Sequence, residues 1–133
     1  MGKAIERIRV TNVFDTSRSK ELDAVVDTGA MMLVLPSDVI DELKLRKVRD
    51  VSVRYANNTR QSKTIYGIVA LDLHGRSGNF DVIEEVAGAQ PLVRQIVLEE
   101  LDLVVECKGR GLIPNPESPD MPLLEILRHD GIG

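Results

Sequence analysis

The stretch LDAVVDTGAMMLVL, from Leu22 to Leu35, places a single polar triplet between two apolar segments. The triplet is Asp27-Thr28-Gly29. Short apolar runs bounded by turn-forming residues are typical of buried strands, so we expect the triplet in a loop between two of them. A carboxylate without a partner is costly to bury at such a place. Asp27 therefore needs a chemical reason, and an ordinary polar turn is the weaker interpretation.

The composition favours a β-rich core. The chain has 133 residues, of which 43% are hydrophobic and only 3% aromatic, so the core must be built from Val, Ile and Leu. A chain of this length predicts one domain over residues 1–133. The net charge of −4 gives no general attraction to nucleic acid or to an anionic membrane, and no apolar run is long enough to span a bilayer. We therefore expect neither nucleic acid nor membrane as a partner.

Cysteine and histidine usage favours a cytoplasmic protein without a metal. Cys107 is the only cysteine, so no intrachain disulfide is possible and a reducing compartment is the simpler interpretation. The first residues lack the uninterrupted apolar run of a signal peptide. His74 and His129 are isolated, with no Cys or carboxylate at ligand spacing beside them. No metal and no other cofactor is expected.

Apolar patterns predict strands over most of the chain and two short helices. The predicted strands are residues 4–13, 22–26, 31–35, 51–55, 64–73, 80–83 and 103–106. Polar turns are predicted at 16–20 and 75–78, a hairpin tip at 56–63 and a loop at 84–91. One helix is expected from Pro36 through Leu45, and the other over residues 95–101 with Val97, Leu98 and Leu101 on one side.

The C-terminal tail, residues 114–133, contains four prolines, which exclude a regular helix. It nevertheless ends in an apolar segment that begins at Leu123. An apolar terminus after a proline-rich run must find a partner surface.

A known chemistry explains each residue of the triplet. Two carboxylates about 3 Å apart can share a proton, because both cannot be ionised together. One then acts as a base on water while the protonated one polarises a carbonyl. Thr28 supplies a hydroxyl and a backbone donor that can fix the loop, and Gly29 lets the backbone approach its partner closely.

The residues VVDTGA, Val25 to Ala30, and the following LVLP resemble the signature of the retropepsin-like aspartic proteases. The resemblance implies a mainly β, closed barrel-like acid-protease fold with one or two short helices and one lobe per chain. It implies that Asp27 is catalytic, that Thr28 and Gly29 support the catalytic loop, and that no cofactor is needed. It also implies a homodimer, and the single DTG triplet agrees because one chain supplies only half of a dyad.

The resemblance extends to a substrate-covering hairpin and to the termini. Residues 53–67 are similar to the flap that closes over a peptide or protein substrate in that family. The implied substrate-binding residues are Ala30, Asn57, Asn58, Thr59 and Arg60. Asparagines replace the usual glycines at the tip, although Asn tolerates positive φ. The family interleaves its termini between subunits, which would give the tail of residues 114–133 its partner.

One departure from the family bears on activity. Residues 91–101 are similar to the second signature, two apolar residues and a glycine before a helix, but Arg94 stands in place of the glycine. If Arg94 points toward the dyad, its positive charge works against the shared proton; if it points outward, it is a solvated surface residue. The sequence therefore predicts an aspartic endopeptidase. The alternatives are a catalytically silent peptide-binding or dimerisation module with the same fold, and an unrelated β-rich scaffold.

Overall fold

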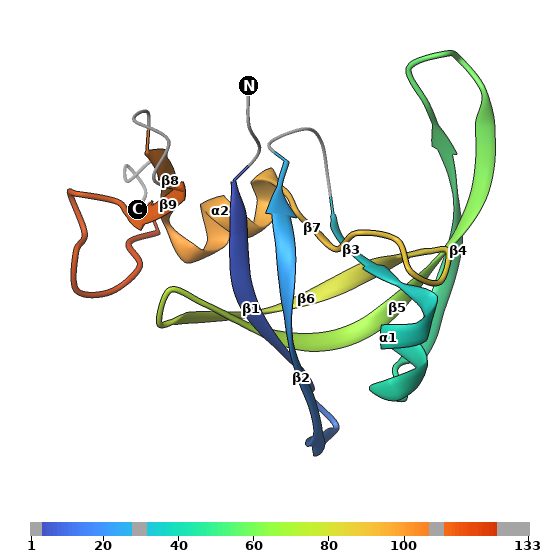
Figure 1. Cartoon of the computed structure of the whole chain (residues 1–133), viewed down its shortest axis with the longest axis horizontal. Coiled ribbons are helices and arrows are strands. Elements are labelled where there is room, and N and C mark those ends of the chain that lie inside the picture. The colour runs from blue at the N-terminus through green and yellow to red at the C-terminus, as the bar shows by residue number, and fades with distance from the viewer. Residues whose placement is uncertain (1–3, 28–31, 107–110, 125–133) are drawn as a thin grey trace, which may run out of the picture.

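The computed structural model describes residues 4–27, 32–106 and 111–124, and in these ranges it contains nine strands and two short helices (Figure 1). The strands are β1 (Ile5–Asn12), β2 (Asp15–Val26), β3 (Leu33–Pro36), β4 (Arg46–Arg54), β5 (Arg60–Leu73), β6 (Arg76–Glu85), β7 (Leu92–Val93), β8 (Leu103–Glu106) and β9 (Gly111–Pro114), and the helices are α1 (Ser37–Glu42) and α2 (Gln95–Leu101).

Seven of these strands form one sheet that curls until it closes. Their order is β1-β2-β7-β3-β6-β5-β4, and β1 also pairs with β5, from Arg9 opposite Asp72 to Asn12 opposite Val69. The pairing closes the sheet into a barrel-like ring, because β1 and β5 lie near opposite ends of the strand order. Within the described residues β4 pairs only with β5, so it extends outside the ring. The predicted mainly β, closed barrel-like fold is confirmed.

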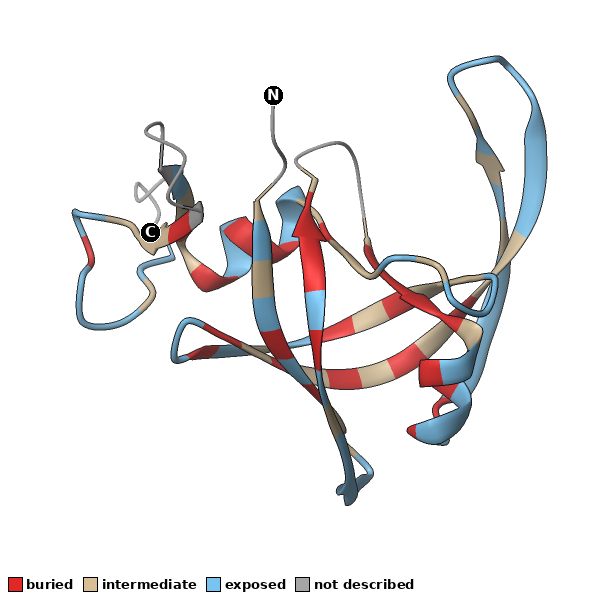
Figure 2. Cartoon of the chain, in the orientation of Figure 1, coloured by how far each residue is buried: buried red, intermediate tan, exposed pale blue. Residues whose placement is uncertain are grey.

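The core lies inside this ring and beneath α2. Alternate residues of β1, among them Ile8 and Val10, are fully buried, as a strand with one buried face requires (Figure 2). Helix α2 packs against β6 and β8 with Val97, Leu98 and Leu101 buried. These are the three residues that the helical spacing placed on one side, and the predicted bounds of α2 are confirmed.

The first hairpin turns earlier than predicted. The chain reverses at Val13 and Phe14, and the segment 16–20, predicted as a turn, lies within β2. Its polar side chains belong to an exposed strand rather than a turn, since Ser19 lies opposite Thr11 and their hydroxyls are 2.9 Å apart. Cross-strand pairs of this kind stabilise a polar strand face. Composition alone could not separate such a strand from a loop.

The turn between β5 and β6 is also shorter than predicted. It consists of His74 and Gly75, whose φ angles of 52° and 74° are those of a two-residue hairpin turn of type I′. Arg76 already pairs with Leu73, so β6 begins there and runs to Glu85. The predicted strand over residues 80–83 was therefore too short at both ends. Most of the predicted turn, 75–78, and the start of the predicted loop at 84 belong to the strand.

Buried Asn12 anchors the end of α1, which stops at Glu42 rather than continuing to Leu45. The Asn12 Nδ2 atom donates to the carbonyl oxygens of Leu43 at 2.8 Å and Lys44 at 3.3 Å. Its Oδ1 accepts from the backbone N–H of Phe14 at 2.8 Å. One side chain therefore ties the first hairpin to the end of the helix.

A second polar cluster holds the C-terminal end of α2 and the segment after β9. Buried Arg76 donates from Nη1 to the carbonyls of Leu101 at 3.1 Å and Asp102 at 2.8 Å, and from Nη2 to the carbonyl of Ser118. The Asp102 carboxylate accepts from the Ser118 hydroxyl, from Asn115 Nδ2 and from the N–H of Leu123. These hydrogen bonds lower the pKa of Asp102 to about 2, the one from Ser118 contributing most.

Candidate active site

Asp27 lies at the end of β2, where the strand leaves the ring. Its N–H donates to the carbonyl of Val93 at 2.9 Å, so its backbone is fixed against β7. Its side chain is 38% exposed, which differs from the deep burial that its apolar flanks predict. The strand before it is buried, as expected, through Val25 and Val26. Thr28, Gly29 and Ala30, the other predicted residues of this loop, lie outside the described residues.

The pairing of β2 with β7 brings Arg94 opposite Asp27. The two strands are parallel, with Val25 opposite Leu92 and Val26 opposite Val93. One further step in this register matches Asp27 with Arg94. The Arg94 Nε atom lies 3.8 Å from Asp27 Oδ2 and is itself buried. The interpretation of Arg94 as an outward-pointing surface residue is therefore wrong.

The start of α2 fixes the direction of Arg94. Its extended backbone, with φ −109° and ψ 176°, precedes the first residue of the helix. Its carbonyl accepts from the N–H groups of Val97 at 3.0 Å and Leu98 at 3.3 Å. The Arg94 side chain is only 24% exposed. The backbone of Arg94 is therefore held in place beside Asp27 by two elements of the fold, β7 and α2.

The hairpin of β4 and β5 occupies the place of the predicted flap and projects from the rest of the sheet (Figure 1). Both strands are longer than predicted, so the connection narrows from residues 56–63 to residues 55–59. The turn closes with the N–H of Tyr55 donating to the carbonyl of Thr59 at 2.8 Å. Asn58 adopts φ 67°, the positive φ that glycine would otherwise supply.

The tip residues Asn57, Asn58, Thr59 and Arg60 are exposed, and their predicted role in substrate binding stays a prediction. Asn57 Oδ1 accepts from the backbone N–H of Thr59 at 3.1 Å and from its hydroxyl at 2.6 Å. This side chain therefore shapes the turn, and its carbonyl oxygen is already engaged in doing so.

A cleft of 840 Å³ lies between this hairpin and the ring. Its size is that of a site for a ligand of several residues or a drug-sized molecule. Its apolar wall comes from β3, β4, β5 and β6, through Val34, Val51, Val53, Ile65 and Ile83. Arg94 also lines it, which connects the cleft to Asp27. Sequence reasoning missed these wall residues because strand alternation does not tell which buried face borders a cleft.

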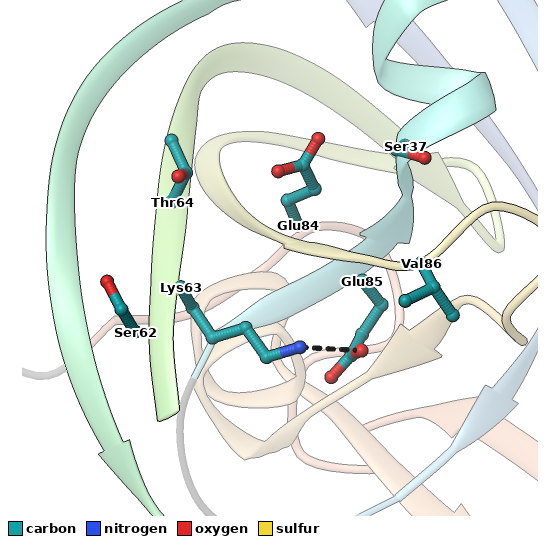
Figure 3. Close-up of a pocket in the computed structure, with 7 residues that line it drawn as sticks. All are labelled: Ser37, Ser62, Lys63, Thr64, Glu84, Glu85 and Val86. Carbon is teal, nitrogen blue, oxygen red and sulfur yellow. Dashed lines mark hydrogen bonds and ion pairs between the residues drawn. The ribbon is translucent and has the colours of Figure 1, made fainter. Parts of the chain in front are cut away.

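A smaller pocket of 340 Å³ adjoins the cleft (Figure 3). Lys63 and Glu85 line both, and Lys63 Nζ donates to Glu85 Oε1 at 2.9 Å. This hydrogen bond raises the pKa of Lys63 above its ordinary value of 10.5. Lys63 is therefore a fixed cation in the wall between the two hollows.

The described residues contain no group of three or more His, Cys, Asp or Glu side chains arranged to hold a metal ion. Neither of the helices described is long and apolar enough to cross a membrane. Cys107 lies outside the residues that the structure describes.

Comparisons with known proteins give a likeness in structure. No protein-family profile and no curated protein sequence matches the chain. The fold is similar to the protease of EIAV in complex with the inhibitor HBY-793, with a TM-score of 0.54 and 16% identity over 74% of this chain and 88% of that one. It is also similar to the simian foamy virus (mac) protease in solution, with a TM-score of 0.51 and 14% identity over 71% of this chain and 91% of that one.

These likenesses agree with the closed, mainly β architecture of the chain. The chain has the retropepsin-like fold, as the DTGA stretch predicted.

Proposed function

We propose that this chain is one subunit of a homodimeric aspartic endopeptidase. The observation that carries the proposal is the position of Asp27, which leaves a buried strand of a retropepsin-like fold beside a cleft covered by a hairpin. Asp27 from two chains would form the dyad, one carboxylate activating water and the other polarising the scissile carbonyl. Thr28 and Gly29 would shape the loop, and an extended peptide would lie under the hairpin.

A second subunit is needed because this chain has one DTG triplet. Exposed apolar side chains near the chain ends support the pairing. Ile5, Met121, Leu123 and Leu124 are all more than half exposed, and residues of this type seek cover in an interface. The homodimer is therefore proposed to form through the terminal segments, in the cytoplasm, where a lone cysteine stays reduced.

Arg94 favours a second candidate function. The Arg94 guanidinium lies 3.8 Å from the Asp27 carboxylate and forms an ion pair with it, whereas a dyad consists of two carboxylates that share a proton. A chain with this fold would then serve as a peptide-binding or dimerisation module and would not cut peptides. This catalytically silent module differs from the protease in one feature only, namely the charge beside Asp27.

Cleavage of a peptide library by purified protein between about pH 4 and 7, a range that suits a shared-proton dyad, tests the proposal. The wild type is compared with Asp27→Asn and Arg94→Gly. The protease proposal predicts cleavage that Asp27→Asn abolishes and Arg94→Gly increases. Cleavage that appears only in Arg94→Gly supports the silent module. Cleavage that persists in Asp27→Asn refutes both assignments of the site.

A further inference from the structure

The hairpin over the cleft carries a charge opposite to that of the rest of the chain. Residues 46–63, called here the cationic hairpin, contain six Lys or Arg and one Asp, a net charge of +5. The chain has 17 basic and 21 acidic residues, so 11 basic and 20 acidic residues remain elsewhere, a net charge of −9. Segregation on this scale creates a local field that attracts anions to an otherwise acidic protein.

The residues that line the cleft are also mainly basic where they are charged. Among the described residues, its lining includes Arg49, Arg54, Lys63 and Arg94 but only one carboxylate, that of Glu85. Glu85 pairs with Lys63, and Arg94 lies beside Asp27. Across the described part of the chain, Arg49 and Arg54 form no ion pair with a carboxylate. These two guanidinium groups are therefore the ones available to an incoming anion.

Their spacing along β4 matches an extended peptide. Arg49 and Arg54 stand on either side of Val51 and Val53, which line the apolar wall and are half-buried. Five residues of strand span about 17 Å, and a peptide lying extended beside β4 rises by the same amount per residue. Because side chains alternate along a strand, Arg49 shares its face of β4 with Val51 and Val53, and Arg54 belongs to the other face. A peptide paired along β4 alternates in step, so acidic residues about five positions apart would lie beside the two arginines, with apolar residues between them on the wall.

We propose that the cleft is specific for extended acidic peptides, in which Asp or Glu residues flank a short apolar segment. This inference rests on the proposed function, since it names the substrate class of the same cleft. A nucleic acid fits less well, because Tyr55 is the one aromatic side chain among the described residues of the lining, and single-stranded nucleic acid needs several aromatic faces on which successive bases stack. Arg49 and Arg54 act as specificity-determining residues.

The test measures binding, without cleavage, in the full-length Asp27→Asn protein. Fluorescence anisotropy compares three labelled peptides that share an apolar centre and carry Glu, Gln or Lys at two positions five apart. At low salt the Glu peptide is expected to bind about tenfold more tightly than the Gln peptide, and the preference is expected to fall as salt rises. The Lys peptide is expected to bind weakest.

Variants locate the effect. Arg49→Gln with Arg54→Gln is expected to remove the preference, and Arg49→Lys with Arg54→Lys to retain most of it. Lys47→Gln is the matched control, because Lys47 lies on the same strand, pairs with Asp50 and does not line the cleft. Equal loss in Lys47→Gln, equal affinity for the three peptides, or no peptide binding overturns the inference. So does a single-stranded oligonucleotide that binds more tightly than the Glu peptide.

Different results would contradict the proposed protease activity and the proposed preference for acidic peptides. Wild-type protein that cleaves neutral and acidic peptides equally well would leave the protease intact and remove the acidic preference. Protein that prefers the Glu peptide but never cleaves it would leave the preference intact and favour the silent module.

Discussion

Arg76→Met removes the central donor of the cluster that holds the end of α2. Arg76 is 5% exposed and donates three hydrogen bonds to backbone carbonyls, those of Leu101, Asp102 and Ser118. Methionine fills much of the same space but cannot donate. Bonds from a charged donor contribute about 1.5 to 3 kcal/mol each. The three bonds sum to about 4.5 to 9 kcal/mol, and we expect a smaller loss of about 3 to 5 kcal/mol, because the segment at Ser118 can move and admit water.

Thermal unfolding followed by circular dichroism measures this loss. The entropy of unfolding at the midpoint is about 0.28 kcal/mol/K for a chain of 133 residues, so Tm is expected to fall by about 11 to 18 °C. The protein concentration must be held fixed, since Tm would depend on it in the proposed dimer.

Arg18→Met is the matched control for this experiment. The Arg18 side chain is 42% exposed and, among the residues that the structure describes, pairs only with Asp15 at the surface, so its loss should cost no more than about 0.5 kcal/mol. Hydrogen exchange adds a local readout, in which Arg76→Met should expose the N–H groups of Asn115 and Ser118. A fall in Tm no larger than that of Arg18→Met would refute the role given to Arg76.

Three further substitutions test other parts of the structure. Asp102→Asn should lower Tm most near neutral pH, because a carboxylate whose pKa is lowered to about 2 stabilises the fold above its unfolded pKa of 3.8 and loses that effect as pH falls between these values. A constant difference in Tm from pH 7 to 2 would contradict this. Asn12→Ala should cost about 1 to 3 kcal/mol in chemical denaturation, because it leaves partly buried backbone groups without their partner, while exposed Asn79→Ala should be nearly neutral. Leu124→Asp should raise the Kd of the proposed dimer about tenfold or more in sedimentation, because the burial of one leucine in its interface would be lost. Val86→Asp, at another exposed apolar residue that lies away from the termini, should leave that Kd unchanged.

The sequence predicts this fold well where local pattern and local structure agree. The apolar flanks of Asp27 predict strands on both sides of its loop, and β2 and β3 lie there. The bounds of α2 and its buried face follow from helical spacing alone. Polar strands and short turns are less predictable, because Ser19 and Thr11 pair across a hairpin that their composition would assign to a loop.

The site depends on contacts between residues distant in sequence. Asp27 and Arg94 meet because two strands pair in parallel, and no local pattern gives that register. Arg76 and Asp102 likewise contribute through neighbours that lie apart in the chain. Charged residues are mostly exposed, so the hydrophobic pattern of the sequence gives no indication that Arg76 is buried. The charge of the hairpin over the cleft was readable from sequence, but its alignment with the cleft was not.

Mixing active and inactive subunits tests most directly the central claim that the catalytic site is shared between two chains. The protein that cleaves, wild type or Arg94→Gly, is unfolded and refolded together with an increasing proportion of the same protein carrying Asp27→Asn, at constant total protein concentration. If two Asp27 carboxylates form one dyad, cleavage should fall with the square of the active fraction. A linear fall, or the absence of cleavage in both wild type and Arg94→Gly, would contradict the claim.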